Sequence, residues 1–225
     1  MIGNTIKSDF ERPDPLLVSL FEGIPVANID DCVGRTRAVC SSVKPIGYKG
    51  PLLGTAFTIR LPKGDNLMLH AAMDLMKPGD VVVIEAGGET ERAIFGELMA
   101  SYMKSRGVKG VLLHGAVRDA EALEAMEDFR VYASGVTPNG PFKEGPGEVN
   151  VPIEFAGQTV FPGDIVTADR DGAMFIRPED AVRLSEEARR VQKKEEAIYR
   201  DIVENSRYVR PWVEEKLREI GTERV

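Results

Sequence analysis

The amino-acid sequence predicts a mixed α/β fold in which parallel strand–helix units are covered by a β-rich layer. The apolar runs VVVIEA (81–86) and GVLLHG (110–115) are typical of buried strands, and each precedes a stretch with helical spacing. Two such units in succession favour parallel pairing, because a helix can return the chain to the same edge of the sheet. After Val149 the pattern changes to short β segments separated by turn signals, which predicts the second layer.

The elements that precede these strands are predicted from apolar spacing and from helix breakers. Residues 14–23 favour a short helix that ends at Gly23, and residues 54–61 alternate as a strand. Asp65 is the expected cap of the next helix, which should end before Pro78.

The remaining helices are predicted before and after the β-rich segment of the sequence. One helical stretch should follow Gly87-Gly88 and end near Gly107. A long C-terminal helix is expected over residues 179–205, where an apolar stripe of 4-3-4 spacing is interrupted by Glu195. The tail, residues 206–225, contains an amphipathic element that we expect to dock on the body or on a neighbouring subunit.

Composition and charge exclude several classes of protein. The net charge of -7 and the pI near 5.1 oppose nucleic-acid binding, which needs clustered cations. No stretch approaches ~18 uninterrupted apolar residues and no signal sequence is evident, so we expect a cytoplasmic protein without membrane partners. We expect one domain over residues 1–225, with its core at about 16–205, because no repeat or linker interrupts the chain. Cys32 and Cys40 should be reduced and partly buried thiols.

The first candidate for chemistry is HGAVRD, where a predicted strand ends and turns into a helix. It places Arg118 and Asp119 at the carboxyl end of the strand, the edge at which α/β proteins bind ligands. In the structural alternative, Asp119 only caps the following helix and Arg118 pairs with a surface carboxylate.

The second candidate is the segment EAGGETERAIFGELM. If its helix begins near Gly96, the amides of Gly96, Glu97, Leu98 and Met99 form an anion-binding cradle. If the helix begins earlier, Glu97 is an ordinary residue in the middle of a helix. The local sequence favours neither start.

The two candidates together carry a family resemblance. Gly96-Glu97 is followed, after twenty residues, by Arg118-Asp119, and the blocks DNLMLHAA, PGDVVVIEAGG, GVTPNG and FPGDIVTADRDGAMFIRPED occur in the matching order. Over about residues 16–205 the chain resembles the family of 4-hydroxy-4-methyl-2-oxoglutarate aldolases and ribonuclease E activity regulator A-like (RraA-like) proteins. This resemblance implies a β/β/α swivelling-domain-like fold, assembled as trimers or hexamers with sites at subunit interfaces.

The resemblance also implies an activity and a set of residue roles. It implies a class II aldolase that cleaves 4-hydroxy-2-oxo acids to pyruvate and decarboxylates oxaloacetate with Mg²⁺ or Mn²⁺. The amides of Gly96 to Met99 would bind the pyruvate carboxylate, and Arg118 would hold that carboxylate and the developing enolate oxygen. Asp119 would be the direct metal ligand, and Glu97 would orient water bound to the metal. This chemistry suits a hard cation, which takes one or two protein carboxylates as ligands. It also suits an arginine, whose planar guanidinium can bind an oxo acid through two hydrogen bonds.

A further acid is expected from the C-terminal helix of an adjacent subunit, as in aldolases of this family. Glu195 is the candidate and Glu196 the fallback, and an interface glutamate paired with an arginine is the alternative. His70 is predicted to be a packed helix histidine, and His114 to have at most a supporting role near the site.

The sequence also leaves other readings open. Asp164 and Asp171 fall in turn motifs, which predicts a structural role. The leading functional alternative is a noncatalytic regulator that binds and inhibits ribonuclease E. A methyltransferase is disfavoured because no G-x-G-x-x-G motif follows a strand, and a phosphohistidine carrier using His114 rests on fold analogy alone. No local signature identifies the residues that contact the far end of a substrate.

Overall fold

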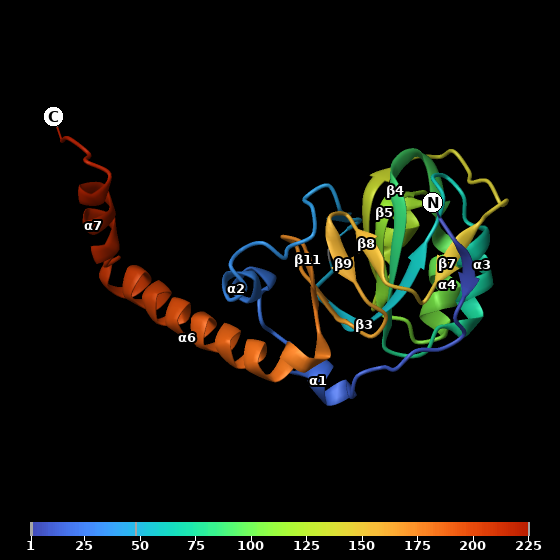
Figure 1. Cartoon of the computed structure of the whole chain (residues 1–225). Helices are drawn as coiled ribbons and strands as arrows, with labels where there is room; N and C mark the ends of the chain where they lie inside the picture. The colour runs from blue at the N-terminus through green and yellow to red at the C-terminus, as the bar shows by residue number, and fades with distance from the viewer. Residues whose placement is uncertain (1, 48, 225) are drawn as a thin grey trace.

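A computed structural model describes residues 2–47 and 49–224 and has a large mixed sheet at its centre (Figure 1). The sheet order is β1-β7-β3-β4-β5-β6-β2, with β10 pairing β3 and β11 pairing β10, and β8-β9 is a separate two-stranded sheet. The strands are β1 (Asn4–Ile6), β2 (Lys44–Pro45), β3 (Leu52–Arg60), β4 (Asp80–Phe95), β5 (Gly110–Val117), β6 (Arg130–Val136), β7 (Gly147–Val149), β8 (Ile153–Phe155), β9 (Gln158–Val160), β10 (Ile165–Ala168) and β11 (Ala173–Ile176).

The helices lie between these strands and at the C-terminal end of the chain. They are α1 (Pro15–Ser19), α2 (Val26–Asp31), α3 (Leu67–Ala72), α4 (Glu97–Ser105), α5 (Ala120–Ala125), α6 (Ala181–Asn205) and α7 (Pro211–Glu219), with 3-10 turns at Met73–Leu75 and Pro178–Asp180. None of the helices within residues 2–47 and 49–224 combines the length and apolar character needed to cross a membrane.

The predicted parallel core is confirmed, since β3-β4, β4-β5 and β5-β6 all pair in parallel. Side chains alternate between the two faces of each strand. Val82 and Ile84 pack on the core that α3, α4 and α5 cover, whereas Val81 and Val83 pack on the core under β8 and β9. Burial on both faces explains why the strand runs are apolar without interruption.

The sequence prediction was wrong about where β4 ends. Gly87 and Gly88 adopt positive φ of 70° and 65° inside the strand and do not start a helix. Beyond them, β4 continues to pair with β5 through register shifts that reach Phe95 opposite Val117. A β-bulge lets one strand absorb extra residues, which stay unpaired in the ladder, while pairing resumes beyond them. The helical stretch is therefore only α4, which starts immediately after the strand.

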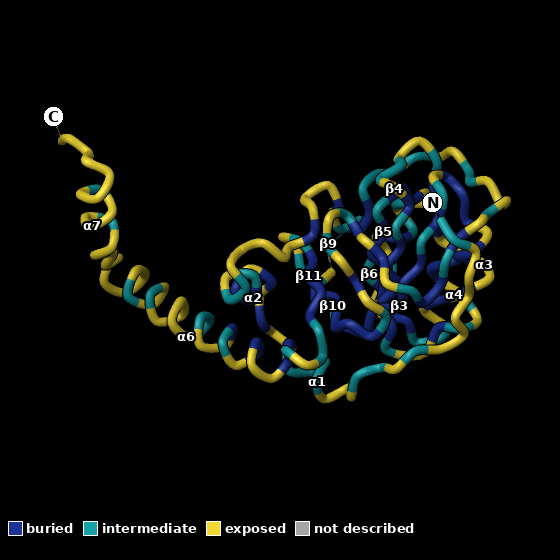
Figure 2. The backbone as a smooth tube through the Cα atoms, in the orientation of Figure 1, coloured by how far each residue is buried: buried dark blue, intermediate teal, exposed yellow. Residues whose placement is uncertain are grey.

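The C-terminal helix is confirmed, but only its first part is covered. Leu184 and Ala188 are buried in a core that also contains residues of α2, β10 and β11. The rest of α6 and all of α7 extend away from the body and are largely exposed (Figures 1 and 2). Docking of the tail on the body of its own chain is therefore wrong, which leaves a neighbouring subunit as the predicted contact.

Two smaller predictions have mixed outcomes. Both cysteines are free, but Cys40 is exposed and only Cys32 is partly buried. Asp164 has the predicted structural role, because it accepts hydrogen bonds of 2.8 Å from the Phe161 amide and from Arg177. Burial raises the pKa of the Asp164 carboxyl above its usual value, and these two partners oppose the shift.

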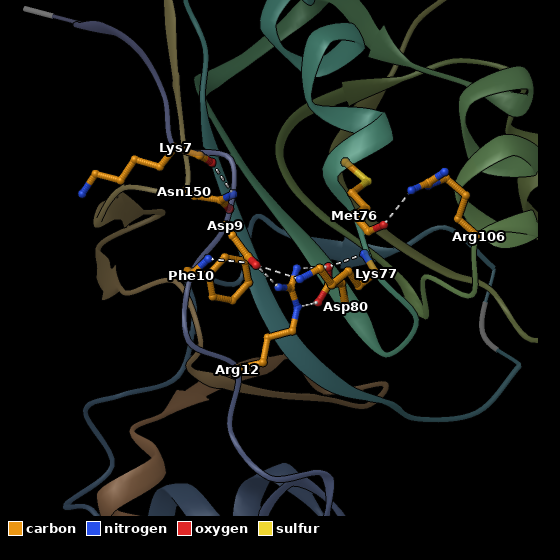
Figure 3. Close-up of polar contacts among 9 residues, drawn as sticks. All are labelled: Lys7, Asp9, Phe10, Arg12, Met76, Lys77, Asp80, Arg106 and Asn150. Atoms are coloured by element: carbon orange, nitrogen blue, oxygen red, sulfur yellow. Dashed lines mark hydrogen bonds and ion pairs between the residues drawn. The ribbon is translucent and has the colours of Figure 1, made fainter.

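Arg12 ties the N-terminal segment to the first residue of β4 (Figure 3). Its Nε and Nη2 donate to the two carboxylate oxygens of Asp80, each at 2.8 Å. The Asp80 side chain is fully buried and also accepts from the Lys77 amide at 2.8 Å. Asp9 bonds to Arg12 as well, and its pKa falls to about 2, chiefly because Lys77 donates a hydrogen bond to it.

Arg12→Met is expected to lower the free energy of unfolding by about 3 kcal/mol, because it leaves the buried Asp80 carboxylate without its charge partner. Urea denaturation followed by circular dichroism measures this change. Arg35→Met is the matched control, since the Arg35 side chain is 77% exposed in its pair with Asp31 and its loss should leave the free energy of unfolding nearly unchanged. Equal effects of the two substitutions would contradict the assignment of Arg12–Asp80 as a buried tie.

Candidate active site

The candidate site lies where β4 and β5 end and α4 begins. Gly96 is the N-cap of α4, with extended backbone (φ -164°, ψ -171°), so the later of the two helix starts is correct. The Ala100 amide donates to Gly96 O at 3.1 Å as the first bond of the helix. The amides of Glu97, Leu98 and Met99 therefore fall in the first turn, where helix amides have no carbonyl partner within the helix. Such amides and the helix dipole favour an anion.

The Asp119 side chain does not cap α5, contrary to the structural alternative for this residue. It occupies the N-cap position of α5 in the left-handed region (φ 58°), but its side chain makes no capping bond to α5. Its Oδ2 instead accepts from the Glu97 amide at 3.1 Å, across to the start of α4. The carboxylate therefore joins two segments that are twenty-two residues apart in the sequence.

Arg118 lies beside this carboxylate. Its Nε is 3.7 Å from Asp119 Oδ2, and the two side chains are 47% and 41% exposed. The pair is thus open to solvent and to a ligand, and Arg118 makes no salt bridge to any other carboxylate among residues 2–47 and 49–224. The carboxylate that Arg118 pairs with is therefore its exposed neighbour Asp119.

Gly96 allows the close approach of the two strand ends. A Cβ atom at Gly96 would lie 2.5 Å from Asp119 Oδ2 and 3.1 Å from Arg118 Cγ. Atoms at such distances overlap, so any side chain here would displace the carboxylate. The glycine is required by space and not by a left-handed backbone.

A cavity of about 340 Å³ opens in front of these groups. It is lined by the end of β4 and the start of α4, by Arg118 and Asp119, and by Asn66, His70, Pro141 and Lys143. A larger cavity of about 470 Å³ lies near Arg12 and Asp80, at the opposite ends of the strands. Because Arg12 and Asp80 already satisfy one another there, the smaller cavity is the better candidate for chemistry.

His70, Asn66 and Lys143 are the cavity residues that the sequence prediction missed. His70 is exposed at the rim on α3 and is not the packed histidine expected. Partial desolvation by the surrounding residues and, secondarily, the nearby charge of Lys143 lower the pKa of His70 below its usual value. The spacing of Asn66 and His70, one helical turn apart, was the available signal. Lys143 lies in a loop between β6 and β7 and had no local signal.

His114 does not line the cavity. Its Nδ1 is 2.9 Å from both carboxylate oxygens of Glu85, and its ring packs edge-on against Phe155 with centroids 6.1 Å apart. Glu85 also accepts from the Ala156 amide at 3.1 Å. His114 therefore helps to fasten β8 to the central sheet, which supports the structural interpretation.

Glu195 and Glu196 are not brought to the cavity of their own chain. Glu195 accepts a hydrogen bond from Asn28 of α2, and both glutamates are exposed. In Figure 1, α6 leaves the body on the side away from α4. The predicted role of Glu195 at a site therefore requires the cavity of another subunit.

The groups present fit a hard divalent cation. Across the residues that the structure describes, no cluster of three or more His, Cys, Asp or Glu side chains is arranged to hold a metal ion. Asp119 is the carboxylate among the cavity-lining residues, with Glu97 next to it at the start of α4. Mg²⁺ keeps several waters and takes one or two protein carboxylates, whereas Zn²⁺ needs three or four protein ligands.

The chain belongs to the RraA-like family, because residues 26–175 match the family model described as Aldolase/RraA. A relative from Halalkalibacterium halodurans is named "Putative 4-hydroxy-4-methyl-2-oxoglutarate aldolase". The two are 32% identical over 200 residues, which make up 89% of this chain and 95% of the relative.

The solved structures that are similar to this chain include two of RraA proteins. The RNA-processing inhibitor RraA from Thermus thermophilis is 30% identical, with a TM-score of 0.62, and the match covers 68% of this chain and 92% of that one. RraAS2 of Streptomyces coelicolor, titled an unusual member of the RNase ES inhibitor RraA family, is 25% identical, with a TM-score of 0.73 over 82% and 97% of the two chains. The predicted fold and family resemblance are confirmed.

Proposed function

We propose that this protein is a divalent-metal-dependent aldolase that cleaves 4-hydroxy-2-oxo acids to pyruvate and also decarboxylates oxaloacetate. The observation that carries the proposal is the meeting of the Asp119 carboxylate, the Arg118 guanidinium and the first turn of α4 in one cavity. The 32% identical relative, named as an aldolase, supports it.

The reaction breaks the bond between C3 and C4 of the substrate. The 4-hydroxyl loses its proton and becomes a carbonyl, while the electron pair of the broken bond stays on C3 as the pyruvate enolate, which is then protonated. In oxaloacetate the same bond breaks and carbon dioxide leaves, giving the same enolate. Each reaction therefore requires positive charge near the 2-oxo oxygen.

The residues of the cavity match these requirements. The first-turn amides of α4 at Leu98 and Met99, with Gly96, bind the C1 carboxylate. Arg118 donates to that carboxylate and to the 2-oxo oxygen, as a planar fork can. Asp119 would hold the divalent cation, which when bound would supply Lewis-acid stabilisation of the enolate charge. Glu97 orients a water that exchanges protons with the substrate.

The assembly is proposed to be a homotrimer or hexamer with sites at subunit interfaces. The uncovered part of α6, the segment after it and α7 expose large apolar side chains: Tyr199, Ile202, Val203, Tyr208, Val209, Trp212 and Ile220. An exposed apolar surface of this kind is typical of a protein interface. If α6 and α7 of one subunit pack on a neighbouring copy, Glu195 or Glu196 of that α6 would reach the cavity of the neighbour.

Release of pyruvate from oxaloacetate should require Mg²⁺ or Mn²⁺ and should be lost after exhaustive EDTA treatment. A lactate-dehydrogenase-coupled assay measures it, and re-adding MgCl₂ is the control for irreversible damage. Borohydride with pyruvate should trap no adduct by mass spectrometry. Full activity without metal, or a trapped lysine adduct, would replace the metal mechanism with a Schiff-base mechanism.

The second candidate is a noncatalytic regulator that binds and inhibits ribonuclease E. The observation that favours it is the likeness to two structures titled as inhibitors of RNA processing or of RNase ES. An RNA-cleavage assay with ribonuclease E, run beside the pyruvate assay, separates the two candidates. Inhibition without pyruvate release would place the regulator first.

A further inference from the structure

We propose that Arg92, which is not among the residues that line the cavity, is a positioning residue of the candidate site. It holds the loop of residues 137–146 beside Arg118 and so limits the direction of the Arg118 guanidinium before a ligand binds. This inference rests on the proposed function, in which Arg118 binds the C1 carboxylate and the 2-oxo oxygen.

Arg118 has no close polar contact that orients it. Its Nε lies 3.7 Å from Asp119 Oδ2, which is beyond hydrogen-bond length, and its side chain is 47% exposed. Within residues 2–47 and 49–224, this side chain donates no hydrogen bond. A long side chain with such freedom must be ordered when a ligand binds, which weakens binding. A neighbouring segment that restricts Arg118 beforehand would reduce this loss.

The loop that joins β6 to β7 is such a neighbour. A Cβ atom built on Gly140 would lie 3.7 Å from a terminal nitrogen of Arg118, so the loop backbone passes beside the guanidinium. Pro141, the next residue, lines the cavity together with Arg118. The position of this part of the loop therefore limits where the guanidinium can point.

Arg92 contacts the loop on both sides of Pro141. Its Nη1 donates to Gly140 O at 3.0 Å, and its Cζ lies 4.1 Å from the centroid of the Phe142 ring. A guanidinium over an aromatic ring is attracted to it. The stem of Arg92 is itself confined, because a Cβ atom on Gly64 would lie 2.9 Å from Arg92 Cδ. One side chain therefore holds both neighbours of a residue that lines the cavity.

The loop is also tied to the body by hydrogen bonds that do not involve Arg92. The amides of three residues donate to Asn139 O, Gly64 O and the Asp65 carboxylate, at 2.9, 2.8 and 2.6 Å, and these residues are Ala93, Phe142 and Glu144. Replacing Arg92 should therefore release the backbone at Gly140 without unfolding the loop.

Arg92→Met should raise KM for oxaloacetate in MgCl₂ by about 3- to 10-fold and leave kcat nearly unchanged. A released Arg118 must be ordered on binding but makes the same contacts once the substrate is bound. Arg92→Lys keeps a cation and a donor, so its KM should return close to that of the unmodified protein. Arg106→Met is the matched control, because Arg106 also donates to two backbone carbonyls and lies over a tyrosine ring, but at the C-terminal end of α4. Its KM should stay unchanged.

Modification of Arg118 by phenylglyoxal, followed by mass spectrometry of the peptides, tests the inference without turnover. The reagent attacks guanidinium groups, and its rate depends on how freely the group is reached. Arg118 should react several times faster in Arg92→Met than in the unmodified protein or in Arg106→Met.

The outcomes separate this inference from the proposed function. An unchanged KM in Arg92→Met, or an equal rise in Arg106→Met, would overturn the positioning role. A fall in kcat alone would also overturn it, because Arg92 would then only stabilise the fold. Equal phenylglyoxal rates in Arg92→Met and the unmodified protein would overturn it whatever the kinetics show. If the protein releases no pyruvate, the aldolase is refuted, and faster modification of Arg118 in Arg92→Met alone would still uphold the positioning role.

Discussion

Asp119→Asn should fold normally and lose more than ~100-fold in metal affinity, with pyruvate release falling in parallel. Asparagine tolerates the left-handed backbone that Asp119 adopts, and its side-chain oxygen can still accept from the Glu97 amide. Stability should therefore change by less than ~1 kcal/mol. The substitution removes the negative charge that a hard cation requires, so the loss of activity should follow entirely from the loss of metal binding. Titration of Mn²⁺ by electron paramagnetic resonance measures the loss directly.

Glu97→Gln is the matched variant for this experiment. It removes a second carboxylate at the start of α4 but leaves Asp119 in place, so it should lower kcat more than it weakens Mn²⁺ binding. The two variants should thus fail differently. Tight Mn²⁺ binding by folded Asp119→Asn would remove the basis for the metal site and return the ribonuclease E regulator to first place.

Gly96→Ala should lower kcat/KM for oxaloacetate by roughly 10- to 100-fold without unfolding the protein. The new Cβ would lie 2.5 Å from Asp119 Oδ2, so the carboxylate must rotate away and lose its bond to the Glu97 amide. Because the Asp119 side chain is 41% exposed, it has room to move, and the cost in stability should stay below ~1 kcal/mol. Steady-state kinetics, with Mn²⁺ titration beside them, measure the effect.

Gly140→Ala is the control for this substitution, because its Cβ would lie 3.7 Å from a terminal nitrogen of Arg118, an ordinary contact distance. It should retain nearly full activity. Loss of activity in both variants would mean that the cavity is sensitive to any added methyl group, and the specific fit between Gly96 and Asp119 would then be wrong.

The sequence by itself determined the elements whose burial follows a regular period. The runs at 81–86 and 110–115 are buried on both faces, so their apolar character reports the parallel core directly. The apolar stripe on residues 179–205 predicts the long helix, although only the first part of that helix is buried. The spacing of Glu97 from Arg118-Asp119 indicated the family and the place of the candidate site, because each group follows a strand whose end lies at the same edge of the sheet.

Only the tertiary structure decided how groups from different elements meet. The start of α4 depends on β4 continuing to pair with β5 beyond Gly87-Gly88, which is a property of the sheet and not of the segment. Asp119 bonds to α4 and not to its own helix, because the two strand ends approach closely at Gly96. Lys143 lines the cavity from a loop, and a loop shows no regular spacing of apolar residues from which its position could be predicted. Periodicity records which face of an element is buried, whereas contacts between distant segments depend on register and packing.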